Sequence, residues 1–189
     1  MVKKMKRKIL LKNIFKHFAL INRHRWLVFK LCCKIGLPWR GLVHDISKYS
    51  PTEFWESVRY YEGTRSPISA AKEEKGYSEA WLHHKGRNRH HAEYWVDVRA
   101  PEQTPIIPYQ YVGEMLCDKL AAGIVYQGKK WKKEYQLEYW KKEKEKVLIN
   151  KKIEELITDF FTQVSLNGIE KTLTKKNIKE LYKKYCMSC

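Results

Sequence analysis

The sequence is poor in the residues that interrupt helices and in the pattern that marks strands. Its 189 residues include only 9 glycines and 6 prolines. Strict alternation of apolar and polar residues is scarce, whereas apolar residues recur over long stretches at the 3.6-residue spacing of helices. With 43% hydrophobic and 13% aromatic residues, the chain is also unlike a disordered one. These features together predict an all-α fold.

The chain also lacks an apolar run of the roughly 18 residues that a membrane-spanning helix requires. Its start has a basic head like that of a signal peptide, but Lys12, Lys16 and His17 break the apolar part and no small-residue cleavage pattern follows. We therefore expect a cytoplasmic protein with no transmembrane segment. An amphipathic stripe in this start suits a membrane surface, but docking on the rest of the protein is the favoured expectation. The stripe consists of Ile9, Leu10, Ile14, Phe15, Phe18 and Ile21.

Cysteine is too infrequent, and too unevenly placed, for a disulfide framework. There are five cysteines, and Cys32 and Cys33 are adjacent within a helical apolar run, so the sequence predicts reduced thiols. Cys186 and Cys189 have the spacing of a metal or redox pair. A single pair at the chain end is a weak signal, and the sequence leaves its role open.

Acidic residues are absent from residues 1–40, which hold 12 lysines and arginines. Residues 41–128 hold 10 basic and 12 acidic residues, and residues 129–189 hold 16 and 9, for a net charge of +17. Basic flanks suit a polyanionic partner such as a nucleic acid, a nucleotide or an anionic lipid. A lysine-rich, solvated surface explains the same charge equally well.

The few breakers divide the chain into helices. Ser50, Pro51 and Glu53 form a capping box that predicts a helix start. Asn88 is expected to cap a helix that carries the His90-His91 pair. The other expected helices cover residues 5–20, 22–35, 42–47, 51–62, 77–86, 109–127, 131–147, 150–165 and 174–186. We expect residues 1–128 to form one domain with a basic N-terminal helix, and residues 129–189 to be charged helices packed on it or extending from it.

Several histidines and an aspartate fall in line with apolar residues. A polar side chain that points into a helical core must be paired or ligated, because burying it bare is costly. His24 lies in line with Ile21 and Val28, and Asp118 with Met115 and Ala122. The other members of this inward set are His44 or Asp45, His84 and His91, whereas His83 and His90 are expected on wetter sides. Imidazole and carboxylate together suit a divalent first-row metal ion.

In this order the histidines and aspartates resemble the HD-domain superfamily of metal-dependent phosphohydrolases. The runs HDISKYSPTEFW and HHKGRNRHHAEYW are similar to an uncharacterised bacterial and phage family with HDLSKFSPEEF and N-x-HH-x-x-YW motifs. The resemblance covers about residues 20–125 and implies an HD-like helical bundle. It implies one metal on His24, His44, Asp45 and Asp118, and a second on His84 and His90 or His91, with Asp45 bridging and Lys48 on the substrate phosphate. No GYP-type motif follows, which argues against a cyclic-dinucleotide substrate.

The function expected from this resemblance is hydrolysis of a nucleotide or another phosphate ester by a metal-activated water. One or two ions of Mn, Fe, Co, Zn, Ni or Mg are expected, with Asp45 and Lys48 as the catalytic residues. Arg87 and Arg89 lie between the histidines and are candidates to orient an anionic substrate.

Two alternatives remain. One is an HD-type di-iron oxygenase. The other is a non-catalytic, basic nucleic-acid-binding protein with a structural metal site, in which aromatic side chains stack on a single strand. Core packing is nevertheless the favoured role of Trp26, Trp39, Trp55, Trp81 and Trp95.

Overall fold

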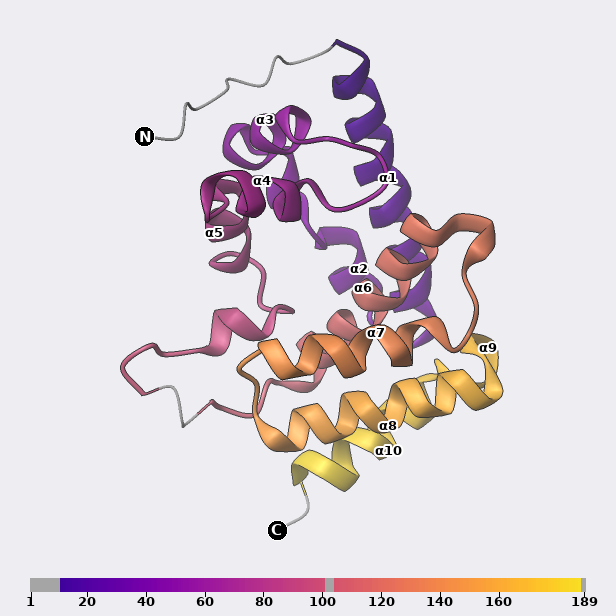
Figure 1. Cartoon of the computed structure of the whole chain (residues 1–189). Coiled ribbons are helices and arrows are strands. Elements are labelled where there is room, and N and C mark those ends of the chain that lie inside the picture. The colour runs from indigo at the N-terminus through magenta and orange to yellow at the C-terminus, as the bar shows by residue number, and fades with distance from the viewer. Residues whose placement is uncertain (1–10, 101–103, 188–189) are drawn as a thin grey trace.

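The computed structural model describes residues 11–100 and 104–187, and within these ranges every regular element is a helix (Figure 1). The all-α prediction is therefore confirmed. The α-helices are α1 Leu11–Lys34, α2 Pro38–Val43, α3 Pro51–Arg59, α4 Pro67–Lys75, α5 Glu79–Lys85, α6 Tyr109–Gln127, α7 Tyr135–Glu143, α8 Lys151–Asn167, α9 Ile169–Thr172 and α10 Lys175–Tyr182. Short 3-10 turns include η1 Ile46–Tyr49 and η2 Ala92–Trp95, and a π-helical turn spans Lys183–Met187.

Helix α6 runs through the middle of the molecule and is buried on nearly every side. It packs against α1 on one flank and contacts α7 and α10 on the other. Figure 1 shows α7 and α8 side by side, with α10 beneath them, while α3, α4 and α5 gather beside the first half of α1. A single apolar core joins α1 and α6 to α8 and α10, from Val28 to Leu181. This arrangement leaves α6 with an apolar side and a side free for polar groups.

Helix α1 is continuous over 24 residues, so the predicted break near residue 21 is wrong. Asn22 is a poor helix former, but its side-chain amide donates to the carbonyl of Phe18 one turn earlier at 2.8 Å, which keeps it inside the helix. Gly41 lets α2 lie close against α1, because a Cβ atom there would come within 2.8 Å of the Cα atom of Phe29 and the Cβ atom of Cys32.

Several helix ends lie where the sequence predicts them. Helix α6 covers the predicted residues, and Gly128 follows its end. Ser50 accepts a hydrogen bond from the N–H of Glu53, so the predicted helix start is confirmed, and Thr174 caps α10 in the same way through the N–H of Asn177. The capping box is only half formed, because the N–H of Ser50 donates to the carbonyl of Ser47 instead of to Glu53. The helix predicted to start at Asn88 is wrong, because the His90-His91 pair lies in the loop before η2.

The residues from 129 onward share the core with the rest of the chain. Trp140, Phe160 and Leu181 are buried in the same cluster as Val28 and Leu116. A division of the chain at residue 128 stays a prediction. The described cysteines Cys32, Cys33, Cys117 and Cys186 are free thiols, and Cys189 lies outside the described residues.

Two predictions of burial are wrong. Trp26, Trp39 and Trp55 are exposed instead of packed in the core; Trp95 does pack against it. In the N-terminal stripe Ile21 is buried, but Phe15 and Phe18 are 68% and 49% exposed. The start of the predicted first helix, with Ile9 and Leu10, lies outside the described residues. No helix in the described part of the chain is both long and apolar enough to cross a membrane.

Candidate metal centre

His44 and Asp45 lie in the turn between α2 and η1, so the helix predicted over residues 42–47 is wrong. Helix α2 ends at Val43, and Asp45 has a φ of 53°. Aspartate tolerates this left-handed conformation better than most side chains do. The turn reverses the chain directly after α2, and both side chains are buried.

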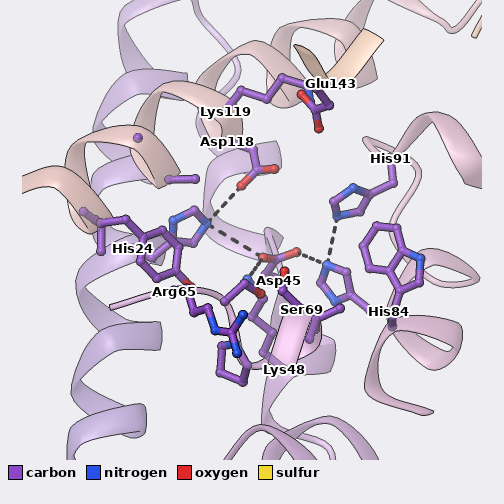
Figure 2. A pocket seen from close by; sticks show the side chains of 18 of the residues that line it. His24, Asp45, Lys48, Arg65, Ser69, His84, His91, Asp118, Lys119 and Glu143 are labelled. Carbon is purple, nitrogen blue, oxygen red and sulfur yellow. Dashed lines mark hydrogen bonds and ion pairs between the residues drawn. The ribbon is translucent and has the colours of Figure 1, made fainter. Parts of the chain in front are cut away.

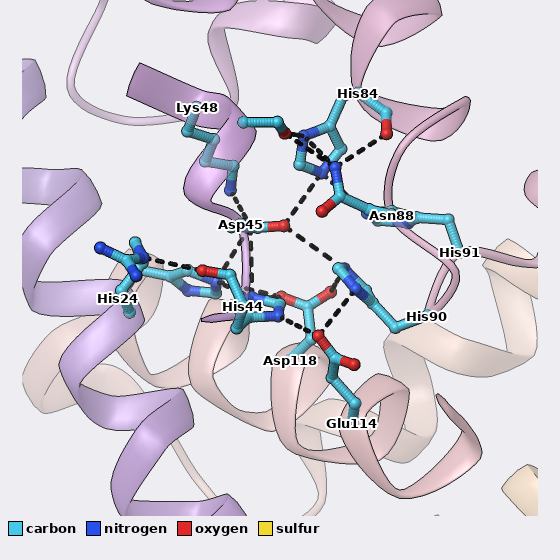
Figure 3. A network of polar contacts seen from close by, with 12 residues as sticks. His24, His44, Asp45, Lys48, His84, Asn88, His90, His91, Glu114 and Asp118 are labelled. Atoms are coloured by element: carbon cyan, nitrogen blue, oxygen red, sulfur yellow. Dashed lines mark hydrogen bonds and ion pairs between the residues drawn. The ribbon is translucent and has the colours of Figure 1, made fainter. Parts of the chain in front are cut away.

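One oxygen of Asp45 faces a group of ligands from α1, the turn and α6 (Figure 3). Its Oδ2 atom lies 3.2 Å from Nε2 of His44 and 3.9 Å from Nε2 of His24. Asp118 closes the group from α6, with Oδ1 at 3.0 Å from His24 Nε2 and 3.5 Å from His44 Nε2. The two imidazole nitrogens are 3.3 Å apart. Four donor atoms therefore converge on one point.

The other oxygen of Asp45 faces a second group, from α5 and the loop that follows it. Its Oδ1 atom lies 3.2 Å from Nε2 of His84 and 3.5 Å from Nε2 of His90. The Nε2 atoms of His84 and His91 are 2.9 Å apart. His90 is buried rather than on a wetter side, so that prediction is wrong. Both members of the His90-His91 pair join the group.

The donor atoms fit a metal ion in each group. Nitrogen–metal bonds of about 2.0–2.1 Å place neighbouring ligand atoms roughly 3 Å apart, close to the 2.9 and 3.3 Å between the imidazole pairs. Asp45 Oδ1 and His90 Nε2 are buried without a hydrogen-bond partner. Buried polar atoms are rarely left so, unless an ion or a water completes them. The two groups are geometrically able to hold metal ions.

A buried glutamate on α6 holds one imidazole of each group. Oε1 of Glu114 lies 3.0 Å from Nδ1 of His44 and 3.1 Å from Nδ1 of His90. Its Oε2 atom accepts from Nε and Nη2 of Arg40 at 2.7 and 2.6 Å. A carboxylate at Nδ1 favours the proton there and leaves Nε2 as the ligand atom.

Glu53, on α3, orients an imidazole of the second group in the same way. Its Oε2 atom lies 2.7 Å from Nδ1 of His84, and its Oε1 atom 2.6 Å from Nδ1 of His83. The sequence suggested Glu53 only as a capping residue, and it missed Glu114. A signal existed for Glu114, since it precedes Asp118 by four residues and shares its helix face. For Glu53 the signal was masked, because one residue serves the cap through its N–H and the histidines through its carboxylate.

Asn88 braces the loop that carries the last two histidines. Its side-chain amide donates to Oγ of Ser47 and to the carbonyl of His84, both at 2.8 Å. The carbonyl of Asn88 accepts from the N–H of His91 at 3.1 Å. The residue predicted as a helix cap therefore ties the loop to α5 and η1 (Figure 3).

The carboxylates of the centre keep their charge despite burial. Burial opposes the charge of Asp45, but His44 and Lys48 outweigh it and hold the pKa of Asp45 well below its usual range. Burial likewise opposes the charge of Glu114, but hydrogen bonds from His44 and His90 lower its pKa to about 2. The centre is therefore a buried site with negative charge to balance.

The imidazoles divide into two kinds. Burial lowers the pKa of His91 well below its usual range, so that ring is neutral. Burial acts in the same direction on His84 and His44, but Asp45 outweighs it, and the pKa of His84 rises to about 9 and that of His44 well above its usual range. Protons on these two rings balance the carboxylates when no cation is bound, and a divalent cation would supply the same charge.

The centre forms one wall of a cavity of about 500 Å³ (Figure 2). Lys48 stands beside it, with Nζ 2.7 Å from Oδ2 of Asp45. Burial disfavours its charge, but Asp45 outweighs this and raises the pKa of Lys48, so the side chain stays a cation. Lys119 also lines the cavity, where it is paired with Glu143 at 2.6 Å.

The structure does not bring the two predicted arginines to the cavity. Arg87 is exposed and donates to the carbonyl of His83. Arg89 is exposed and donates to the hydroxyl groups of Tyr94 and Tyr111. The arginine that does line the cavity is Arg65, from the loop between α3 and α4, which is paired with Glu62 and Glu73.

Comparison with known protein families gives a match over most of the chain. A model described as a family of unknown function, DUF5662, matches residues 13–163. The match starts in α1 and ends in α8, so it includes every residue of both ligand groups. Neither the curated proteins nor the solved structures yield a match to the chain.

Proposed function

The chain belongs to DUF5662, a family of unknown function, and we propose from its site that it is a metal-dependent hydrolase of phosphate esters, with a nucleotide as the favoured substrate. One observation carries the proposal. The two oxygens of Asp45 face two different ligand groups, Oδ1 toward His84 and Oδ2 toward His44. The proposal includes the kinship with the HD-domain superfamily that the sequence resemblance implies.

Two metal ions that share a carboxylate would make hydroxide available near neutral pH and would bind the oxygens of a phosphate ester. His24, His44, Asp45 and Asp118 would hold one ion, and His84, His90, His91 and Asp45 the other. Glu53 and Glu114 fix the orientation of the ligating rings from behind. Such preorganisation matters because the ligands then need no rearrangement during the reaction.

Lys48 is suited to the phosphate. Its ammonium group is charged and lies at the cavity wall beside the shared carboxylate. A cation at this place offsets negative charge as it develops on the phosphate oxygens. Lys119 is a weaker candidate, because Glu143 already neutralises it.

The rest of the cavity supports a substrate larger than phosphate alone. About 500 Å³ falls within the roughly 300–1,000 Å³ of small-molecule sites. The lining also includes Tyr139, Trp140 and Gln136, and the buried carboxamide oxygen of Gln136 has no hydrogen-bond partner in the described part of the chain. Aromatic rings beside an unpaired acceptor suit a nucleobase. We expect Gln136→Leu to raise KM for a nucleotide and to leave KM for p-nitrophenyl phosphate unchanged.

Metal analysis of neighbouring histidine variants tests the centre. We expect about two equivalents of transition metal in the wild-type protein, about one in His84→Ala, and none in Asp45→Ala. His83→Ala is the matched control, since His83 touches Glu53 but belongs to neither ligand group. Equal metal content in the His83 and His84 variants, with both folded by circular dichroism, would contradict the proposal.

A phosphate-release screen tests the reaction. Nucleoside monophosphates, diphosphates and triphosphates and p-nitrophenyl phosphate would be compared with the metal-loaded protein. Lys48→Met should lower kcat about a hundredfold, whereas Lys129→Met, at an exposed position in the turn after α6, should have no effect. Absence of phosphate release from every substrate, in protein shown to carry its metal, would rule out the proposal.

The donor set also supports a second candidate. Five imidazoles against two carboxylates favour a transition metal over magnesium. An iron-loaded protein that consumes oxygen and releases no phosphate would be a di-iron oxygenase instead. Assays of the same preparation with and without oxygen distinguish the two reactions.

A further inference from the structure

The outer face of α1, defined here as Leu11, Phe15, Phe18 and Trp26, is apolar and open. These side chains are 49–72% exposed. Their spacing of four, three and eight residues places them along one side of the helix, separate from the side that buries His17, Ile21 and Val28. An apolar stripe on the solvent side of a surface helix indicates something that covers it.

The apolar surface extends beyond α1. Trp39 and Leu42 on α2 are exposed, at a spacing that places them on one side of that helix. The two helices pack against each other, and Arg25 of α1 donates to the carbonyl of Leu42 of α2. Exposed apolar side chains therefore occur on both packed helices.

A basic row runs beside the outer face, consisting of Lys12, Lys16, Arg23 and Lys30. All four side chains are exposed, and none has an ion-pair partner among the residues that the structure describes. Each lies one turn or two from the next, so the row follows the apolar stripe along the helix. Residues 1–10 of the sequence add five more basic residues and no acidic ones.

We propose that α1 docks on an anionic lipid surface, with its outer face in the boundary between headgroups and acyl chains and its basic row on the headgroups. A helix with aromatic and leucine side chains flanked by lysine and arginine binds such surfaces in the plane of the membrane. A second copy of the chain is a poorer occupant, because the basic row of one copy would face the basic row of the other. Single-stranded nucleic acid would use the tryptophans but not the leucines.

The proposal is independent of the proposed function. The opposite side of α1 lines the cavity with His17, Ile21 and His24. A membrane on the outer face therefore leaves the metal centre facing away from the lipid. Docking and catalysis would use two sides of one helix, and each can fail without the other.

Vesicle co-sedimentation of the full chain tests the docking. We expect binding to vesicles of equimolar phosphatidylcholine and phosphatidylglycerol, little binding to phosphatidylcholine alone, and loss of binding as salt is raised. Leu11→Ser with Lys12→Glu should weaken partitioning about tenfold. Leu166→Ser with Lys171→Glu makes the same chemical changes at exposed positions on α8 and α9 and should leave partitioning unchanged.

Three results would overturn the proposal. The first is equal binding to both kinds of vesicle, and the second is an equal response of the two double variants. The third is a self-association or a binding to single-stranded nucleic acid that the Leu11 and Lys12 changes abolish, in a protein that ignores vesicles. Far-UV circular dichroism of both variants excludes loss of folding, since all four altered positions are exposed.

Discussion

The two ends of the molecule bury opposite kinds of side chain. Around Asp45 the buried side chains are imidazoles and carboxylates, held by one another and by two cations, Arg40 and Lys48. Between α7, α8 and α10 most of the buried side chains are apolar, and Phe160 and Phe161 are fully enclosed. Helix α6 belongs to both, since Asp118 faces the centre and Leu120 faces the core.

This difference separates stability from function. Each apolar side chain of the C-terminal helices stabilises the fold through its own burial. A buried carboxylate at the centre is tolerated only because its neighbours compensate it, and it contributes little net stability. The C-terminal helices are therefore expected to support a centre that is costly by itself, and substitutions at the two ends should act on different measurements.

The largest effect is expected at the apolar end. Phe161→Ala should lower the free energy of unfolding by about 3–5 kcal/mol, because it removes a fully buried ring that packs on Phe160 and leaves a cavity. Metal content per folded molecule should not change. Denaturant unfolding and metal analysis of the folded fraction check both statements. Loss of metal from the folded variant would show that the two ends are not separable.

Parts of the core and of the metal centre can be predicted from the sequence, for physical reasons. The sequence predicts helix α6 at its full length, because its apolar pattern is long and a glycine marks its end. His24 and Asp118 were singled out because each stands in an apolar row of its helix. The helical period alone identifies a polar residue on an apolar helix face, whichever group that residue binds or contacts.

Other features depend on contacts that periodicity does not encode. The turn at Asp45 needs a positive φ, which aspartate permits but does not demand. Glu53 reaches two histidines some thirty residues away, while its own neighbours predict only a cap. Helical spacing favours buried faces for Trp26 and Trp39, but both side chains are exposed in the structure.

The next effect concerns metal removal, which should destabilise the protein through the centre alone. Each bound ion, at about a hundred times its Kd, should stabilise the wild-type fold by about 2.7 kcal/mol, and a chelator should remove that gain. Phe161→Ala should show the same gain, because distant sites act additively. Asp45→Asn should show none. Thermal unfolding with and without chelator measures all three, and a chelator effect in Asp45→Asn would contradict the assignment of the ligands.

The two outer glutamates should differ in which ions they affect. Glu53→Gln should weaken only the ion held by His84, by about ten- to a hundredfold, because Glu53 orients no ring of the other group. Glu114→Gln should weaken both ions, because Glu114 holds His44 and His90. Competition with a metal indicator gives two binding constants for each variant. The same pattern in both variants would refute the division of the centre into two groups.

The smallest effect is expected at Glu56, which belongs neither to the metal centre nor to the apolar core. Glu56 attaches α5, and with it His84, to α3. The carboxylate accepts from Lys75, from Oγ of Ser78 at 2.6 Å and from the N–H of Ala80 at 2.7 Å. Burial opposes its charge, but these hydrogen bonds outweigh burial and lower the pKa of Glu56 below the usual 4.5. Its stabilisation is therefore complete above about pH 4.5 and is lost as the pH falls through the lower folded-state pKa.

Glu56→Gln should consequently lower the free energy of unfolding by about 1–2 kcal/mol at pH 7, and the difference from wild type should shrink as the pH is lowered toward 3. Glu79→Gln is the matched control, because Glu79 also pairs with Lys75 but is 60% exposed, and it should show no such dependence on pH. Denaturant unfolding at each pH measures the difference. A difference that stays constant below pH 4.5 would mean that the carboxylate charge of Glu56 does not hold α5 in place, and that the neutral hydrogen bonds and packing alone position His84.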